Sequence, residues 1–203
     1  MSDQPKIGDL PDAQTIWSKR WRMQNLYPIK TEDARLVPLR FRPVQEALFE
    51  RAQATGWRGI RPFVLKNRKP GVTTFYEIAY LDDSLFSSNR NTLIQAHRQD
   101  DLEKLFEIVR LAYEQCPSSV RLQDGSRWYK PRARTENKRE LVFDGMHSKI
   151  SVALSNIGGT NHNLHISEAA SIENVDERIR PTLETVPNRA YGSNISVEST
   201  AKG

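Results

Sequence analysis

The fold that this sequence predicts is decided by one stretch, Leu65-Lys66-Asn67-Arg68-Lys69-Pro70-Gly71-Val72-Thr73-Thr74. An apolar run at 62–65 precedes it and is typical of a buried strand, whereas residues 75–81 follow it with helical spacing. The basic loop is therefore expected at a corner between a strand and a helix. A phosphate group binds well at such a corner, because the first backbone N–H groups of a helix are free and the helix dipole is positive there.

The loop has the physical design of a P-loop, with two departures from the standard pattern G-x-x-x-x-G-K-[ST]. Lys66 stands where the first glycine belongs, and Val72 stands where the lysine belongs. Gly71 suits a close approach of backbone to phosphate, and the Thr73 hydroxyl suits Mg²⁺. The alternative interpretation is an exposed basic turn. The predicted nucleotide-binding residues of the loop are Lys66, Asn67, Arg68, Lys69, Pro70, Gly71, Val72, Thr73 and Thr74, and which of its three cations meets the γ-phosphate stays open.

Composition indicates one α/β domain, since the chain has 203 residues, of which 37% are hydrophobic and 27% charged. No apolar run approaches the ~20 residues that span a bilayer, and the polar start is unlike a signal peptide. The single cysteine, Cys116, excludes an internal disulfide. We therefore expect a cytoplasmic protein. Its net charge of +5 favours a polyanionic partner.

Basic residues gather at 121–139, where they are accompanied by Trp128 and Tyr129. Cations interleaved with aromatic rings suit contacts with a nucleic-acid backbone and stacking on bases. A solvated, charged loop is the alternative. The predicted DNA-binding residues are Arg127, Lys130, Arg132 and Arg134.

The remaining elements alternate between strands and helices, which predicts a mainly parallel sheet with helices on both faces. One short strand carries Ser167 and Glu168 at its end. His162 and His165 do not predict a zinc site, since residues three apart on a strand point to opposite faces. The expected elements are helices at 12–26, 43–49, 100–113 and 173–184, and strands at 91–97, 140–144, 149–154, 163–168 and 192–198.

Three stretches together resemble the ATPase domain of the large terminase subunit of tailed bacteriophages. In that family an arginine stands three residues before the loop glycine, as Arg68 does, and the lysine can stand at the start of the loop, as Lys66 does. Some members carry a serine–glutamate pair after a leucine–histidine–hydrophobic run and a glycine–glycine–threonine turn. The matching residues here are Gly158, Gly159, Thr160, Leu164, His165, Ile166, Ser167 and Glu168, followed by the small hydroxyl residues Ser199 and Thr200.

The resemblance covers residues 35–203 and implies a RecA-like P-loop ATPase of the ASCE type that uses ATP and Mg²⁺. It also implies a role for each matching residue. These roles are Mg²⁺ binding by Thr73 directly and by Ser167 through water, polarisation of the attacking water by Glu168, charge stabilisation by Arg68, adenine sensing by Gln45, and coupling of hydrolysis to DNA movement by Ser199 and Thr200.

The implied activity is ATP hydrolysis that drives double-stranded DNA into a procapsid in the host cell, with portal protein and small terminase subunit as partners. Such motors form rings on the portal, and we expect the isolated domain to be a monomer. The expected division is a helical segment at 1–34 and the ATPase domain at 35–203, with no nuclease domain after it. This would make the chain an expressed fragment, or the product of a truncated or split prophage gene.

Two alternatives remain. A helicase-like DNA translocase shares the early motifs, although helicases usually carry an aspartate–glutamate pair where this chain has Ser167 and Glu168. A non-hydrolysing prophage remnant that only binds DNA or a partner is the alternative of another class. Val72 and Ser167 would then be marks of decay.

Overall fold

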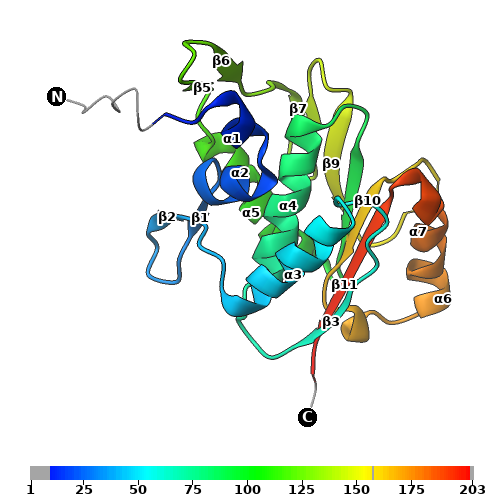
Figure 1. Cartoon of the computed structure of the whole chain (residues 1–203). Coiled ribbons are helices and arrows are strands. Elements are labelled where there is room, and N and C mark those ends of the chain that lie inside the picture. Colours follow the sequence, from blue (N-terminus) through cyan, green and yellow to red (C-terminus); the bar gives the residue numbers. More distant parts are fainter. Residues whose placement is uncertain (1–9, 157, 202–203) are drawn as a thin grey trace.

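A central sheet of seven strands organises the computed structural model (Figure 1), in the order β3-β11-β10-β4-β9-β8-β7. The structure describes residues 10–156 and 158–201. The polar start of the chain, Ile157 beside the glycine turn, and the last two residues of the C-terminal stretch lie outside the described residues. The strands are β3 (Phe63–Lys66), β4 (Asn91–Gln95), β7 (Ala133–Glu136), β8 (Glu140–Phe143), β9 (Ser148–Ala153), β10 (Asn163–Ile166) and β11 (Asn194–Thr200).

The five strands from β3 to β9 in this order are parallel, and β8 and β7 continue the sheet antiparallel. The prediction of a mixed α/β fold with a mostly parallel sheet is therefore confirmed. Parallel strands end at the same edge of a sheet. Thr200 of β11 accordingly lies opposite Lys66 of β3, and Ile166 of β10 lies opposite Val197.

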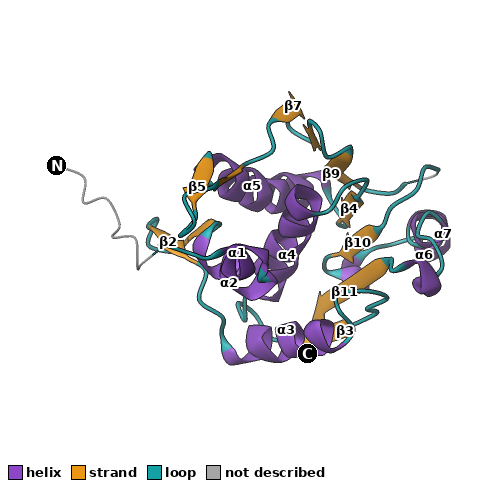
Figure 2. Ribbon diagram, turned by 45° about the horizontal axis from the view of Figure 1, so that its top comes forward, coloured by secondary structure: helices purple, strands orange, loops and turns teal. Residues whose placement is uncertain are grey.

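Helices cover both faces of the sheet (Figure 2). On one face lie α4 (Val72–Phe86) and α5 (Gln99–Gln115), and on the other lie the short helices α6 (Val175–Arg178) and α7 (Arg180–Glu184). The larger apolar core packs around α4 and α5, while a smaller cluster around Leu93, Leu164 and Ile172 fills the opposite face. The other elements are α1 (Ala13–Trp17), α2 (Lys19–Asn25), α3 (Pro43–Ala54), the hairpins β1 (Pro28–Lys30) with β2 (Leu36–Pro38) and β5 (Ser119–Arg121) with β6 (Arg127–Tyr129), and the 3-10 turns η2 (Ala169–Ser171) and η3 (Arg189–Tyr191).

Helix α4 is the central helix of the fold, and 11 of its 15 residues are buried. Burial on all sides leaves no water for its charged residues, so they must be paired inside the protein. Asp82 accepts hydrogen bonds from Arg22 at 2.7 and 2.8 Å, from Lys19 at 3.1 Å and from Tyr27 at 2.9 Å. This cluster attaches the N-terminal helices to the core.

Two predicted helices are interrupted. The helix expected at 12–26 is wrong in its continuity, because Ser18 has an extended backbone and caps α2 with its hydroxyl, which accepts from the Trp21 N–H at 3.4 Å. The helix expected at 173–184 divides into α6 and α7. Pro181 lies in the first turn of α7, where it has no N–H to offer to the turn before it.

Two expectations about strands also need correction. The run at 62–65 is no buried strand, since β3 is the edge of the sheet and leaves Phe63 and Leu65 about two-thirds exposed, at 68% and 66%. Strand β11 pairs with both β3 and β10 and lies between them. Ser199 and Thr200 belong to β11 itself and do not follow it. An apolar run and a polar end in the sequence do not reveal which strand lies at the edge of the sheet and which lies inside it.

Among the described residues, none of the helices combines the length and the apolar character that crossing a membrane requires.

Candidate active site

The phosphate-loop corner is shaped by Gly71, where the chain enters α4. Gly71 caps the helix in the left-handed region, with φ of 82°, which a residue with a Cβ atom adopts only at a cost. A Cβ atom there would also lie 2.7 Å from Nε2 of Gln45. Both the backbone and the neighbouring side chain therefore require glycine.

Gln45 braces this corner from α3. Its Nε2 donates to the Gly71 carbonyl at 2.7 Å, and its Oε1 accepts from the Arg42 N–H at 2.9 Å. The side chain is buried, and both polar atoms of its amide are hydrogen-bonded to the protein backbone. A place for Gln45 beside adenine stays a prediction, and in this structure the residue holds the loop.

Lys66 points from the end of β3 toward the first turn of α4. Its Nζ donates to Oγ1 of Thr73 at 3.1 Å and lies 3.2 Å from Oε2 of Glu198 and 3.4 Å from Oε1 of Glu168. The side chain is only 10% exposed. The lysine at the start of the loop is thus directed to the hydroxyl and the two carboxylates that meet there.

Ser167 and Glu168 follow β10 and reach the same place. The Ser167 hydroxyl donates to Oε1 of Glu198 at 2.9 Å. Glu168 has a positive φ of 51°, and its carboxylate accepts from the backbone N–H and the hydroxyl of Thr200 at 3.0 and 2.8 Å. Burial raises the pKa of Glu168, but these hydrogen bonds and Lys66 outweigh it and lower the pKa. The carboxylate is therefore ionised at neutral pH.

Glu198 on β11 is a site residue that sequence reasoning missed. It is fully buried, and its Oε1 accepts from the Thr73 hydroxyl at 2.5 Å as well as from Ser167. Burial raises the pKa of Glu198, but His165 and Lys66 outweigh it and lower the pKa to about 2. The signal lay in the alternation of β11, where the polar residues Asn194, Ser196 and Glu198 share one face.

His165 lies beneath this group and connects it to α4. Its Nδ1 is 2.8 Å from Oε1 of Glu77, and its Nε2 is 3.6 Å from Oε1 of Glu198. Burial lowers the pKa of His165, but the two carboxylates outweigh it and raise the pKa to about 9. The imidazole is thus a buried cation between two glutamates.

The rest of the loop forms one wall of an open cleft at the carboxyl ends of the strands. The cleft has a volume of about 720 Å³, within the range of small-molecule sites. Arg68 is exposed and lines it, as does Lys69, which has φ of 65° and pairs with Glu32 at 3.0 Å. The lining residues are Lys66, Arg68, Lys69, His97, Glu168, Ser171, Thr200 and Ala201. Of the other predicted loop residues, Asn67 is exposed, Pro70 and Thr74 are half-buried, and Val72 is buried.

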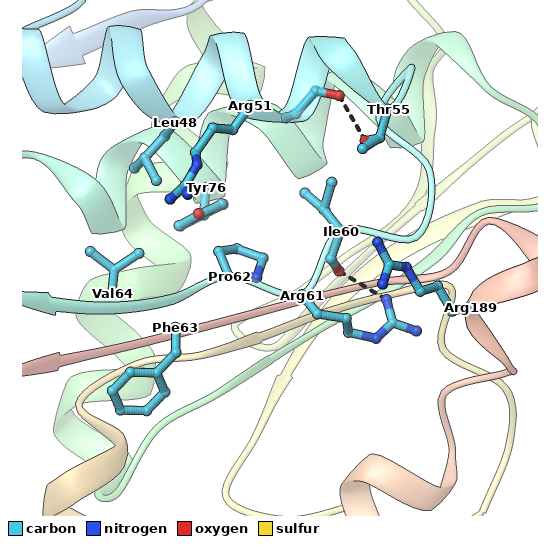
Figure 3. Close-up of a pocket in the computed structure, with 11 residues that line it drawn as sticks. Leu48, Arg51, Thr55, Ile60, Arg61, Pro62, Phe63, Val64, Tyr76 and Arg189 are labelled. Carbon is cyan, nitrogen blue, oxygen red and sulfur yellow. Dashed lines mark hydrogen bonds between the residues drawn. The ribbon is translucent and has the colours of Figure 1, made fainter.

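A second cavity, of about 350 Å³, lies between α3 and the first half of β3 (Figure 3). Arg51, Arg61 and Arg189 contribute to its lining, and the Arg61 guanidinium donates to the Ile60 carbonyl. Among the described residues that line this cavity there is no carboxylate. Acid–base chemistry is therefore better served by the cleft at the strand ends.

The predicted DNA-binding segment runs from β6, in the separate hairpin β5-β6, to β7 at the opposite edge of the central sheet. Trp128 stacks on Phe86 with ring centroids 4.8 Å apart, and Lys130 donates to the Tyr113 and Cys116 carbonyls at the end of α5. These two side chains therefore pack on or bond to the core of the protein and are not free to contact DNA. The exposed residues between 127 and 134 are Arg127, Tyr129, Arg132 and Arg134.

The donor set of the site fits Mg²⁺, which prefers oxygen ligands and keeps several waters and phosphate oxygens. Within residues 10–156 and 158–201, no group of three or more His, Cys, Asp or Glu side chains could hold a metal ion by itself. Thr73, Ser167 and Glu198 supply oxygens, and Oε2 of Glu198 is buried without a hydrogen-bond partner among the described residues. This oxygen lies 3.2 Å from the Lys66 ammonium group, so its surroundings already accommodate a cation.

Fold and site define a mixed α/β protein with a charged cleft at the carboxyl ends of a mainly parallel sheet, where such folds bind ligands. The sequence matches no family model and no curated protein. Solved structures that share the fold include two from phage terminases. The large terminase of bacteriophage HK97 is 12% identical, with a TM-score of 0.64 over 87% of this chain and 36% of that one. A mutant of the ATPase domain of the Thermus phage P74-26 large terminase is 19% identical, with a TM-score of 0.52 over 80% of this chain and 66% of that one.

The resemblance to phage large terminases that the motifs indicated is thus confirmed in the fold. The chain spans 36% of the length of the HK97 protein and 66% of the P74-26 domain.

Proposed function

We propose that residues 35–203 form the ATPase motor domain of a phage DNA-packaging terminase large subunit, preceded by an N-terminal segment at 1–34 that contains α1, α2 and β1. The domain would be a RecA-like P-loop ATPase of the ASCE type. One observation carries the proposal: chain segments far apart in sequence meet at the ends of β3, β10 and β11. Thr73 contacts Glu198 across 125 residues of sequence, and Lys66 reaches Glu168. The fold shared with two phage terminases supports it.

The loop from Lys66 to Thr74 would hold the phosphates of ATP. Free N–H groups at the start of α4 would donate to them, and Lys66, Arg68 and Lys69 are the cations available to offset their charge. Thr73 would hold Mg²⁺ directly and Ser167 through a water. When bound, the ion neutralises charge that develops on the transferred phosphoryl group.

Glu168 would orient the attacking water and accept its proton. Its carboxylate is ionised and 32% exposed, so that water can reach it. The two hydrogen bonds from Thr200 fix its direction. Because Thr200 ends β11, a change at the carboxylate would be felt by this strand, which supports Ser199 and Thr200 as coupling residues.

The work done would be translocation of double-stranded DNA into a procapsid in the host cytoplasm, by a ring of subunits on the portal protein together with the small terminase subunit. The exposed arginines Arg127, Arg132 and Arg134 would contact DNA phosphates. The isolated domain would be a monomer.

The proposal predicts that Glu168→Ala abolishes Mg²⁺-dependent phosphate release from ATP. Loss of a positioned general base lowers turnover by about 10²–10⁴-fold, while nucleotide binding should persist because the phosphate loop is unchanged. The assay measures phosphate release with and without duplex DNA. Glu177→Ala, an exposed glutamate on α6, is the matched control and should keep full turnover.

Other outcomes separate the alternatives. Equal turnover in the natural chain and Glu168→Ala would remove Glu168 from the mechanism. ATP binding without turnover, together with DNA binding that salt weakens and nucleotide does not change, would favour the non-hydrolysing remnant. No nucleotide binding at all would overturn the phosphate-loop assignment.

A further inference from the structure

A buried row of polar side chains lies between α4 and the sheet. On β11 it contains Asn194, Ser196 and Glu198, and all three are buried. The residues between them, Ile195 and Val197, pack on the other face of the sheet. Helix α4 faces this row with polar groups of its own, since Tyr80 donates to the Ser196 hydroxyl at 3.1 Å. The row ends at the phosphate loop with Glu198, its one carboxylate on β11.

Glu198 holds both hydroxyls that the proposed function assigns to the metal. Its Oε1 accepts from Thr73 at 2.5 Å and from Ser167 at 2.9 Å. A hydroxyl that donates its proton to a carboxylate turns its lone pairs outward and becomes a better ligand for a cation. The two hydroxyls come from α4 and from the end of β10, so a single oxygen of Glu198 fixes their separation.

The second oxygen of Glu198 has a cation beside it. Oε2 is 3.2 Å from Nζ of Lys66, a distance that makes an ion pair, yet it has no hydrogen-bond partner among the described residues. Lys66 also contacts Thr73 and Glu168. Its ammonium group thus lies among oxygen atoms from three residues, which is the kind of surrounding that suits a small cation.

We infer that Glu198 supplies the negative charge on the metal side of the site that Ser167, a neutral residue, does not supply. Glu198 acts through Thr73 and Ser167 as a positioning residue, and Lys66 neutralises it while no nucleotide is bound. The inference rests on the proposed function, because it concerns the Mg²⁺ that accompanies ATP. In this chain Val72 stands in place of a lysine and Ser167 in place of an acid. Glu198 would therefore keep a negative charge beside the metal position.

A purely structural role for Glu198 is the competing explanation, since it also faces the buried His165. Glu77 provides the matched control. It is equally buried and lies against the same imidazole at 2.8 Å, and among the described residues its carboxylate makes no hydrogen bond with Thr73 or Ser167. A structural role alone predicts that Glu77→Gln and Glu198→Gln behave alike.

The test follows binding of a fluorescent ATP analogue while Mg²⁺ is titrated, so that it needs no turnover. We expect Glu198→Gln to raise the half-saturating Mg²⁺ concentration by about 10–100-fold, the usual effect of losing a partner of a metal ligand. Nucleotide binding in EDTA should be unchanged, and Glu77→Gln should keep the natural midpoint. Adding Ser167→Asp to Glu198→Gln should bring the Mg²⁺ midpoint back toward that of the natural chain, since the aspartate returns one carboxylate to the same place.

An unchanged midpoint in a folded Glu198→Gln overturns the inference and leaves the proposed function standing. Equal shifts in both glutamine variants also overturn it. If circular dichroism shows Glu198→Gln to be unfolded, Glu198→Asp keeps the charge and withdraws it by one methylene group; its midpoint should rise, and an unchanged midpoint counts against the inference. A natural chain that binds no nucleotide overturns both proposals.

Discussion

Gly71 joins a backbone requirement to a packing requirement. Its φ of 82° is in the left-handed region, and its carbonyl is the acceptor of the Gln45 amide at 2.7 Å. The glycine therefore decides both the direction in which α4 starts and how tightly α3 holds the loop.

We expect Gly71→Ala to destabilise the protein by about 1–2 kcal/mol through its backbone alone. An additional loss should arise because Gln45 must move away from the new methyl group, which would lie 2.7 Å from its Nε2. Urea denaturation measures the free energy of unfolding. Gly125→Ala is the matched control, since Gly125 has φ of 86° and, among the described residues, no atom within 4 Å of the added carbon. Equal losses in both variants would show that the contact with Gln45 contributes nothing.

Glu168 has a left-handed backbone conformation at the position of its proposed catalytic role. A left-handed residue with a side chain is strained, and such residues persist where the surroundings hold them. Here φ is 51°, and the two hydrogen bonds from Thr200 hold the carboxylate. The direction of this carboxylate therefore depends on β11 as much as on β10, which carries it.

At the scale of elements, the attachment of α2 to α4 depends on a buried charge. Asp82 is fully buried and has three hydrogen-bonding partners, so its carboxylate joins the N-terminal helices to the central helix. Removing one partner of a buried ion pair leaves the other uncompensated.

We expect Asp82→Asn to lower the free energy of unfolding at neutral pH by about 3–5 kcal/mol, because Arg22 and Lys19 lose their counter-charge. Chemical denaturation is the measurement. Asp33→Asn removes the acid of an exposed pair with Arg35 and should leave stability almost unchanged. A similar loss in both variants would contradict the role given to burial.

The same residue predicts a pH dependence. Burial raises the pKa of Asp82, but Lys19 and Arg22 outweigh it and bring the pKa below the ordinary value of 3.8. A carboxylate whose pKa is lower in the folded state stabilises it fully above the unfolded pKa. The contribution is lost as pH falls through the lower, folded pKa. The natural chain should therefore lose stability on acidification below about pH 4 more steeply than Asp82→Asn.

At the scale of the whole molecule, the candidate active site and the exposed arginines occupy opposite parts of the sheet. The phosphate loop follows β3 at one edge, and Arg132 and Arg134 flank the start of β7 at the other. Charge changes at the second edge should thus alter DNA binding without altering nucleotide chemistry.

We expect Arg134→Ala to weaken duplex DNA binding and to reduce the slope of log K against log salt by about 1, the effect of one phosphate contact. Fluorescence anisotropy at several salt concentrations is the measurement. Arg180→Ala removes one exposed charge from α7 and should leave the slope unchanged. An unchanged slope in Arg134→Ala would mean that this edge does not contact DNA.

Local patterns in the sequence determined the order and type of most elements. The strand, loop and helix around Gly71, the strand at 91–97 and the hairpin at 140–154 all follow from spacing and turn chemistry. Neighbouring residues suffice for such features because helix and strand periodicity are local properties of the chain. The grouping of Lys66, Thr73, Ser167 and Glu168 came instead from the resemblance to phage terminases. In the structure these residues meet around Glu198 and Lys66.

Only the tertiary structure decided which strands are neighbours. It thereby showed that Glu198 belongs to the site. The insertion of β11 between β3 and β10 brings Glu198 to Thr73 and Ser167, and Thr200 to Glu168. Strand order depends on contacts between segments more than a hundred residues apart, as between Thr73 and Glu198, which are separated by 125 residues. The physical reason is that a buried carboxylate is stable only beside partners such as Lys66 and His165, and the sequence does not reveal its partners until the sheet is assembled.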